Sequence, residues 1–197
     1  MRARIPLSIL GLVAATGLAV PARAGNLPRI DASLGRTVGV LGAIDGGGIS
    51  ASLSALWPVE EGPLSAGAML FADDLGSELG RLRDPNDGTD LGAVALSHRQ
   101  AYGGAWRVDL DGPSWRGWRS FGSGTWGYYR IQDDRRGASL GALSSAGFSL
   151  GTGARRVLAG TQSVGLAVRY HRLFNDRAGR YVSVAADWFW LWGQKPQ

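Results

Sequence analysis

The sequence predicts an all-β fold, namely an eight-stranded antiparallel up-and-down β-barrel that crosses a membrane. Three observations predict it. Apolar residues alternate with small or polar ones along several segments, Gly accounts for 31 of the 197 residues, and turn motifs separate the segments. A hydrophobic period of two belongs to strands. A Gly-rich chain with short, regular apolar stretches also favours β structure over helix.

The first 24 residues have the pattern of a secretory signal peptide. Arg2 and Arg4 precede an apolar stretch at residues 7–20, and small residues at Ala22 and Ala24 suit a signal peptidase. The alternative is an N-terminal anchor, but the apolar stretch is short for a membrane span. We therefore expect residues 1–24 to be cleaved and residues 25–197 to form one barrel domain.

The overall charge of +5 includes three basic residues of this leader. The remaining chain has 18 basic and 16 acidic residues, about +2, and no basic run. This composition argues against nucleic acid as a partner. The absence of Cys excludes disulfides, thiolate metal sites and a lipid anchor at a processed Cys.

In the N-terminal half we expect strands at residues 30–43, 49–58, 63–72 and 91–108. The second is the clearest, because Ile49, Leu53 and Trp57 share one face and serines share the other. In the first, Arg36 falls on the apolar face, so we expect either a bulge near Gly35 or a different register. The acidic, turn-rich residues 73–90 predict the longest outer loop.

In the C-terminal half we expect strands at residues 118–132, 138–153, 162–173 and 180–192. Residues 137–154 carry no charge and contain two small-xxx-small spacings, which a membrane helix would also explain. The alternation of apolar with Gly and Ser residues favours a strand. Turn residues punctuate the chain at 45–48, 60–63, 111–113, 133–137 and 175–179.

The alternation alone would also suit a soluble β-sandwich with its apolar faces turned inward. The positions of Trp favour a membrane. If the mature chain starts in the periplasm, seven of the eight Trp fall near the periplasmic ends of strands, Trp126 being the exception. Indole rings prefer the headgroup level. We therefore predict an aromatic girdle formed by Trp57, Trp106, Trp115, Trp118, Trp188, Trp190 and Trp192.

Residues 125–130, 145–153, 168–172 and 181–184 together resemble the small outer-membrane β-barrel domain of the outer-membrane protein A type. The resemblance covers residues 115–192 by motif and the first half by pattern. The last strand is also similar to the C-terminal signal read by the barrel-insertion machinery, although five residues follow Trp192. We expect a monomer in the outer membrane of a diderm, Gram-negative bacterium, in contact with outer-membrane lipid and lipopolysaccharide.

Eight strands leave an interior filled by side chains rather than an open channel. Arg169 and Asp187 share the inward parity on neighbouring strands, so we expect them to be diagonal neighbours and to form a structural ion pair. Two His without Cys give no zinc spacing. We predict no metal ligand and no cofactor.

The sequence points to no catalytic residue. A lipid A deacylase uses a His-x-Ser-Asn motif on a late strand, but Leu173 stands where the Ser would follow His171. No Ser or acid can be tied to His98 from sequence. We expect a non-enzymatic surface or structural protein that binds partners through its outer loops. Two alternatives remain, a lipid-modifying barrel enzyme and a soluble, secreted lipocalin-like binding protein.

Overall fold

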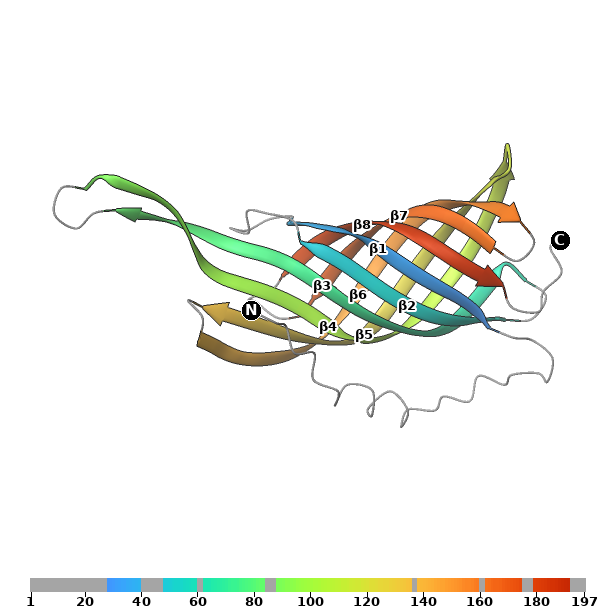
Figure 1. Ribbon diagram of the computed structural model, residues 1–197. Helices are drawn as coiled ribbons and strands as arrows, with labels where there is room; N and C mark the ends of the chain where they lie inside the picture. Colours follow the sequence, from blue (N-terminus) through green and yellow to red (C-terminus); the bar gives the residue numbers. More distant parts are fainter. Residues whose placement is uncertain are drawn as a thin grey trace.

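The computed structural model describes residues 28–39, 48–59, 62–83, 88–135, 138–159, 162–174 and 179–191. They form a closed antiparallel barrel in which each strand pairs with the next along the chain (Figure 1). This confirms the predicted all-β, eight-stranded antiparallel fold. The predicted signal peptide and Trp192 lie outside the described residues. The strands are β1 (Arg29–Gly39), β2 (Ile49–Pro58), β3 (Leu64–Arg83), β4 (Asp90–Trp115), β5 (Trp118–Arg135), β6 (Ala138–Ala159), β7 (Gln162–Leu173) and β8 (Arg180–Leu191).

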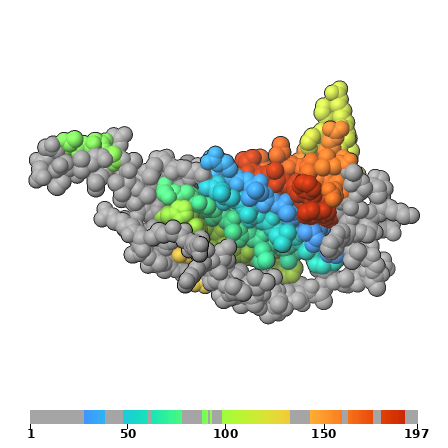
Figure 2. Space-filling view, viewed as in Figure 1, coloured from blue at the N-terminus to red at the C-terminus, as the bar shows by residue number. Residues whose placement is uncertain are grey.

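The barrel closes where β1 lies between β2 and β8, as the blue, cyan and red surfaces of Figure 2 show. When the paired residues are followed once around the barrel, starting from Trp190 on β8, they lead back to β8 at Arg180, ten residues away. For eight strands this stagger corresponds to a tilt of about 40°. We call the end where β1 begins and β8 ends the termini end, and the opposite end the loop end.

Large apolar side chains cover much of the outside of the barrel, and many polar and charged side chains are buried in its interior. Leu53, Val168 and Val184 are 53%, 48% and 44% exposed, whereas Ser50 and Ser54, on the same strand as Leu53, are buried. This direction is the reverse of what a soluble β-sandwich requires. It is the arrangement of a barrel whose outer face meets an apolar solvent. Among the described residues, no helix is long and apolar enough to cross a membrane.

The prediction of a long loop at residues 73–90 is wrong. β3 continues to Arg83 and β4 begins at Asp90, so most of this segment is a β-hairpin arm that extends past the barrel at the loop end (Figure 1). A bulge between Asp74 and Gly76 starts the arm, and Gly76 adopts a positive φ of 86° there. We call the part of the barrel wall that carries outward apolar residues such as Leu53, Val168 and Val184 the apolar belt. The acidic residues of the arm are compatible with a strand because the arm lies outside this belt.

The predicted turn at residues 111–113 is also wrong. β4 passes through this segment with a bulge between Asp111 and Ser114 and ends at Trp115. The turn lies at Arg116 and Gly117, whose φ values of 50° and 80° fit a two-residue type I′ hairpin. The Asp-Gly-Pro signal marks a bulge here, which is another place where Gly and Pro are tolerated in strands.

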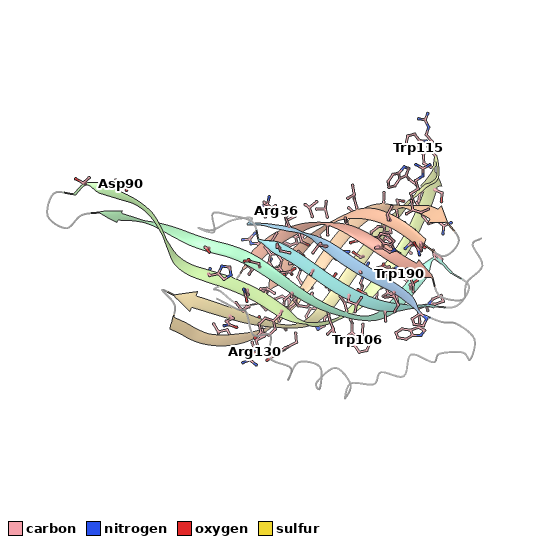
Figure 3. The ribbon with its side chains drawn as sticks, viewed as in Figure 1. Arg36, Asp90, Trp106, Trp115, Arg130 and Trp190 are labelled. Carbon is pink, nitrogen blue, oxygen red and sulfur yellow. The ribbon has the colours of Figure 1, made fainter. Side chains whose placement is uncertain are left out.

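Arg36 lies on the outward, apolar face of β1, and no bulge or register shift interrupts the strand there. β1 pairs without interruption with both neighbours, so Arg36 lies opposite Ile49 on one side and Val184 on the other. It is exposed and lies near the loop end of β1 (Figure 3). Both predicted explanations for Arg36 are therefore wrong. The preceding residue must be small, since a Cβ on Gly35 would lie 2.0 Å from the carbonyl oxygen of Val184.

Candidate functional site

Four charged side chains meet inside the barrel, each at most 6% exposed: Arg29, Asp31, Arg107 and Asp109. Arg29 Nε lies 3.0 Å from Asp31 Oδ1, and Arg107 Nε lies 2.8 Å from Asp109 Oδ1. Arg29 also contacts Asp109, and Arg107 Nη2 lies 3.3 Å from Asp31 Oδ2. Each cation therefore faces both anions, and the charges of this quartet cancel, as burial requires.

Arg169 and Asp187 also meet in the interior. Arg169 Nη2 lies 2.8 Å from Asp187 Oδ2, and Arg169 Nη1 donates a hydrogen bond of 3.1 Å to Ser33 Oγ. The expected diagonal register is wrong, because Asp187 lies opposite Gly165 and Arg169 lies opposite Ser183. The long arginine side chain spans this offset along the strands.

His171 belongs to a second polar group in the interior. Its ring stacks on Tyr181 at 4.2 Å between centroids, and its Nε2 lies 3.0 Å from Ser183 Oγ. Tyr181 donates a hydrogen bond of 2.5 Å to Asp73, which also accepts one of 2.6 Å from Ser50. His171 is thus held among groups that position it, and none of them is an activated nucleophile.

Apolar side chains close the interior on both sides of these polar groups. Toward the termini end, Phe121 and Phe189 pack edge to face at 5.9 Å. Toward the loop end, Phe71 and Tyr129 lie 4.5 Å apart within a larger buried cluster. The interior that the structure describes is therefore packed. The larger cluster contains Met69, Phe71, Leu75, Ala101, Ala105, Tyr129, Ile131, Leu173 and Tyr181.

The Trp residues that the structure describes lie in three places. Trp57, Trp188 and Trp190 lie near the termini end of β2 and β8. Trp115 and Trp118 flank the β4–β5 turn. The remaining two lie opposite each other on β4 and β5, further along the barrel wall.

Trp106 does not lie at the termini end, as the predicted girdle requires. It lies directly opposite Trp126, which in turn lies opposite Phe148, and Figure 3 shows it near the middle of the barrel. The reason is that β4 runs on past Trp106 to Trp115 instead of ending near 108. The ring centroids of Phe174 and Trp126 lie 5.5 Å apart, so Phe174 extends this outward aromatic cluster.

The structure brings partners to His98 that sequence analysis could not identify. His98 Nδ1 lies 3.1 Å from Ser77 Oγ, and its Nε2 lies 3.6 Å from Asp74 Oδ1. Gln100 Nε2 lies 3.2 Å from His98 Nε2. This rim cluster depends on the bulge after Asp74, which sets Ser77 opposite His98. Within the described residues, no three His, Asp or Glu side chains are grouped to hold a metal.

Exposed arginines lie at the loop end on the outward parity of β1, β5, β7 and β8. Figure 3 shows two of them on different sides of the barrel. The register places Arg172 directly opposite Arg180. The outward residues between these arginines and the termini end are apolar, small or uncharged along the same strands. The loop-end arginines are Arg36, Arg130, Arg172 and Arg180.

An apolar outside, a closed register and a packed interior that contains charged side chains define the class of small eight-stranded outer-membrane-type β-barrels. In fold, the chain is similar to Neisserial surface protein A (NspA), with a TM-score of 0.59, 13% identity, and coverage of 86% of this chain and 98% of that one. It is also similar to a major outer membrane protein from Thermus thermophilus, with a TM-score of 0.50, 13% identity, and coverage of 83% and 98%.

The attachment invasion locus protein Ail of Yersinia pestis, solved with the heparin analogue sucrose octasulfate, aligns at a TM-score of 0.47 and 10% identity over 83% of this chain and 98% of that one. No protein-family model matches the sequence, and no curated protein matches it. These likenesses concern the fold.

Proposed function

We propose that the protein is an integral outer-membrane β-barrel that acts without catalysis, as a surface or structural protein that meets partners through its loop end. The observation that carries this proposal is the direction of the side chains. Leu53, Val168, Leu166 and other apolar residues point outward between the loop-end arginines and the Trp residues of the termini end, while the interior is filled. A filled interior does not favour transport through the barrel.

The two rims differ in a way that supports one orientation. Guanidinium groups pair well with phosphates, and lipopolysaccharide presents phosphates at the outer surface. The loop-end arginines suit this surface. Trp57 and Trp190 at the other end suit the headgroup level of the periplasmic leaflet. In this orientation the predicted leader and the barrel-insertion machinery deliver the chain, and the barrel works as a monomer.

The arms supply the surface for partners. β3 and β4 pair only with each other over residues 76–83 and 90–95, and β5 pairs with β6 as far as Arg135 and Ala138. Figure 1 shows both hairpins extending beyond the barrel at the loop end. In the proposed orientation they stand above the lipopolysaccharide surface.

The test uses two matched arginine substitutions on outward positions. Leu53→Arg introduces a charge in the middle of the apolar belt, and Val38→Arg introduces it near the loop end of β1. In a bilayer the first should cost about 2–4 kcal/mol and the second about 0–1 kcal/mol. A folded small barrel migrates anomalously on gel electrophoresis until the sample is boiled, and we call this band heat-modifiable. We expect Leu53→Arg, and not Val38→Arg, to reduce the heat-modifiable band in isolated outer membranes. Wild-type protein in the soluble periplasmic fraction would refute the proposal.

The rim cluster favours a second candidate, a lipid-modifying barrel enzyme. Ser77 is within hydrogen-bond reach of His98 Nδ1, and Asp74 lies on the other side of the ring. A serine, a histidine base and an orienting group are the parts of a nucleophilic ester hydrolase. The register sets them on the outward face, directly past Ala72 and Tyr102. A lipid ester at the membrane surface would be the substrate.

This candidate is tested by ester hydrolysis in reconstituted vesicles. If it holds, wild-type protein releases fatty acid from phospholipid, and Ser77→Ala and His98→Gln both abolish the release. Ser144→Ala is the matched control, because Ser144 is an exposed serine on β6 outside the cluster. Wild-type protein without hydrolytic activity would exclude the enzyme and leave the non-enzymatic proposal standing.

A further inference from the structure

The β4–β5 hairpin is built differently from the rest of the termini end. It extends past the bulge at Asp111 and turns at Arg116 and Gly117. Figure 1 shows this hairpin standing away from the barrel wall, and Figure 2 shows it as a separate lobe. Figure 3 places Trp115 at its tip.

The outward face of this hairpin is aromatic and cationic. Trp118 lies opposite Trp115 on β4 and opposite Arg156 on β6. The Arg116 guanidinium carbon lies 4.6 Å from the centroid of the Trp115 ring. Trp115 is 69% exposed and Trp118 is 38% exposed. Two indoles and two guanidiniums therefore share one accessible surface. This surface follows directly after Leu110, the last outward aliphatic residue of the apolar belt on β4.

The inward face of the same hairpin carries two arginines that share one carboxylate. Arg119 lies opposite Arg155, and both face Asp111, which Arg155 contacts and which lies 3.9 Å from Arg119 Nη1. On the outward face, none of the carboxylates that the structure describes lies within ion-pair distance of Arg116 or Arg156. The hairpin thus separates paired from unpaired positive charge on its two faces.

We propose that the outward face formed by Trp115, Arg116, Trp118 and Arg156 binds the phosphate groups of anionic phospholipids in the periplasmic leaflet. This inference rests on the proposed function, because it requires the termini end to meet that leaflet. The indoles occupy the headgroup level, where an apolar ring and an N–H donor are both satisfied. The guanidiniums donate charge-assisted hydrogen bonds to phosphate oxygens.

The experiment measures lipid selectivity of the full mature barrel in vesicles of phosphatidylcholine mixed with phosphatidylglycerol. Spin-labelled forms of each lipid report the relative association constant for the protein surface. Two variants lose positive charge on the outward face: Arg156→Gln, and Arg156→Gln combined with Arg116→Asn. Asn is chosen because Arg116 has a positive φ, which Asn tolerates. Arg119→Gln removes one charge from the inward face and is the matched control.

We expect the preference for phosphatidylglycerol to fall by about fivefold for each outward arginine removed at low salt, and to stay unchanged in Arg119→Gln. The loop-end arginines are the same in every variant, so they do not affect the comparison. If the double variant does not fold, Arg156→Gln alone still decides the result. Wild-type selectivity in Arg156→Gln, or an equal loss in Arg119→Gln, would overturn the inference.

Two further outcomes separate this inference from the proposed function. Failure of the wild-type barrel to become heat-modifiable in vesicles would contradict membrane insertion itself. Normal insertion without any change in lipid selectivity would contradict only the lipid site. Binding of isolated peptidoglycan that depends on Arg116 and Arg156, with lipid selectivity unchanged, would assign the face to a different occupant and also overturn it.

Discussion

Arg107 on β4 and Asp31 on β1 meet across the interior of the barrel, with Arg107 Nη2 3.3 Å from Asp31 Oδ2. β2 and β3 lie between these two strands in the sheet, so this contact joins parts of the wall that are not hydrogen-bonded to each other. Arg107 donates a further hydrogen bond of 3.0 Å to Ser54 on β2. The charged quartet therefore ties together strands that the backbone ladder does not connect.

Removal of one member of this quartet should be costly. Arg107→Met leaves Asp31 and Asp109 with a single cation, and a broken buried pair typically costs about 3–5 kcal/mol. We expect a lower urea midpoint for the unfolding of the barrel in vesicles. The double variant Arg107→Met/Asp109→Leu removes a neutral pair and should lose less than Arg107→Met alone. A double variant at least as unstable as the single one would argue against charge balance as the cause.

The glycine at position 35 should resist any larger residue. A Cβ there would lie 2.0 Å from the Val184 oxygen, whereas the nearest atom to a Cβ on Gly122 is 4.0 Å away. Overpacking typically costs about 1–3 kcal/mol, so Gly35→Ala should lower the fraction that refolds into the heat-modifiable form. Gly122→Ala is the matched control and should refold as the wild type does. Equal behaviour of the two variants would contradict the tight β1–β8 contact.

The depth of the Trp residues can be measured directly. In variants that retain a single Trp, Trp106 should be quenched most by lipids brominated deep in the acyl chain. Trp190 should be quenched most by bromine near the headgroup, because it lies at the termini end (Figure 3). Equal depths for the two indoles would restore the original girdle and contradict the register of β4.

Interior packing should matter more than the outward face. Phe71 is 6% exposed and packs on Tyr129, so Phe71→Ala should cost about 3–5 kcal/mol in unfolding free energy. Leu53→Ala removes an outward side chain whose place lipid can fill, and it should cost clearly less. The urea midpoints of both variants in the same vesicles check this order. A larger loss for Leu53→Ala would indicate that the outward face is packed against protein.

The sequence was most informative where one face of a strand is buried and the other is not. β2 and β7 have the bounds that alternation predicts, 49–58 and 162–173, because both strands lie almost wholly within the apolar belt. Beyond the apolar belt, neither face of a strand has to be apolar, so the alternation of apolar and polar residues no longer marks where a strand ends. The extension of β3 to Arg83 was missed for this reason.

Contacts that depend on register could not be read from the chain in the same way. The parity of Arg169 and Asp187 placed both inside, but their offset of four residues along the strands follows from the register of the β7–β8 hairpin, in which Arg169 lies opposite Ser183. The contact of Ser77 with His98 depends on one extra residue at the bulge after Asp74. Gly76, with its positive φ, is the only nearby trace of that bulge in the sequence.

The pairing of β1 with β8 has a consequence for synthesis of the chain. Its eleven residue pairs join the first strand to be made with the last. Until the ribosome has released β8, the outer edges of β1 and β7 carry backbone N–H and C=O groups without partners. Such edges are excluded from hydrocarbon. A polypeptide that ends before Arg180 therefore leaves both edges unpaired and cannot close the barrel within a membrane.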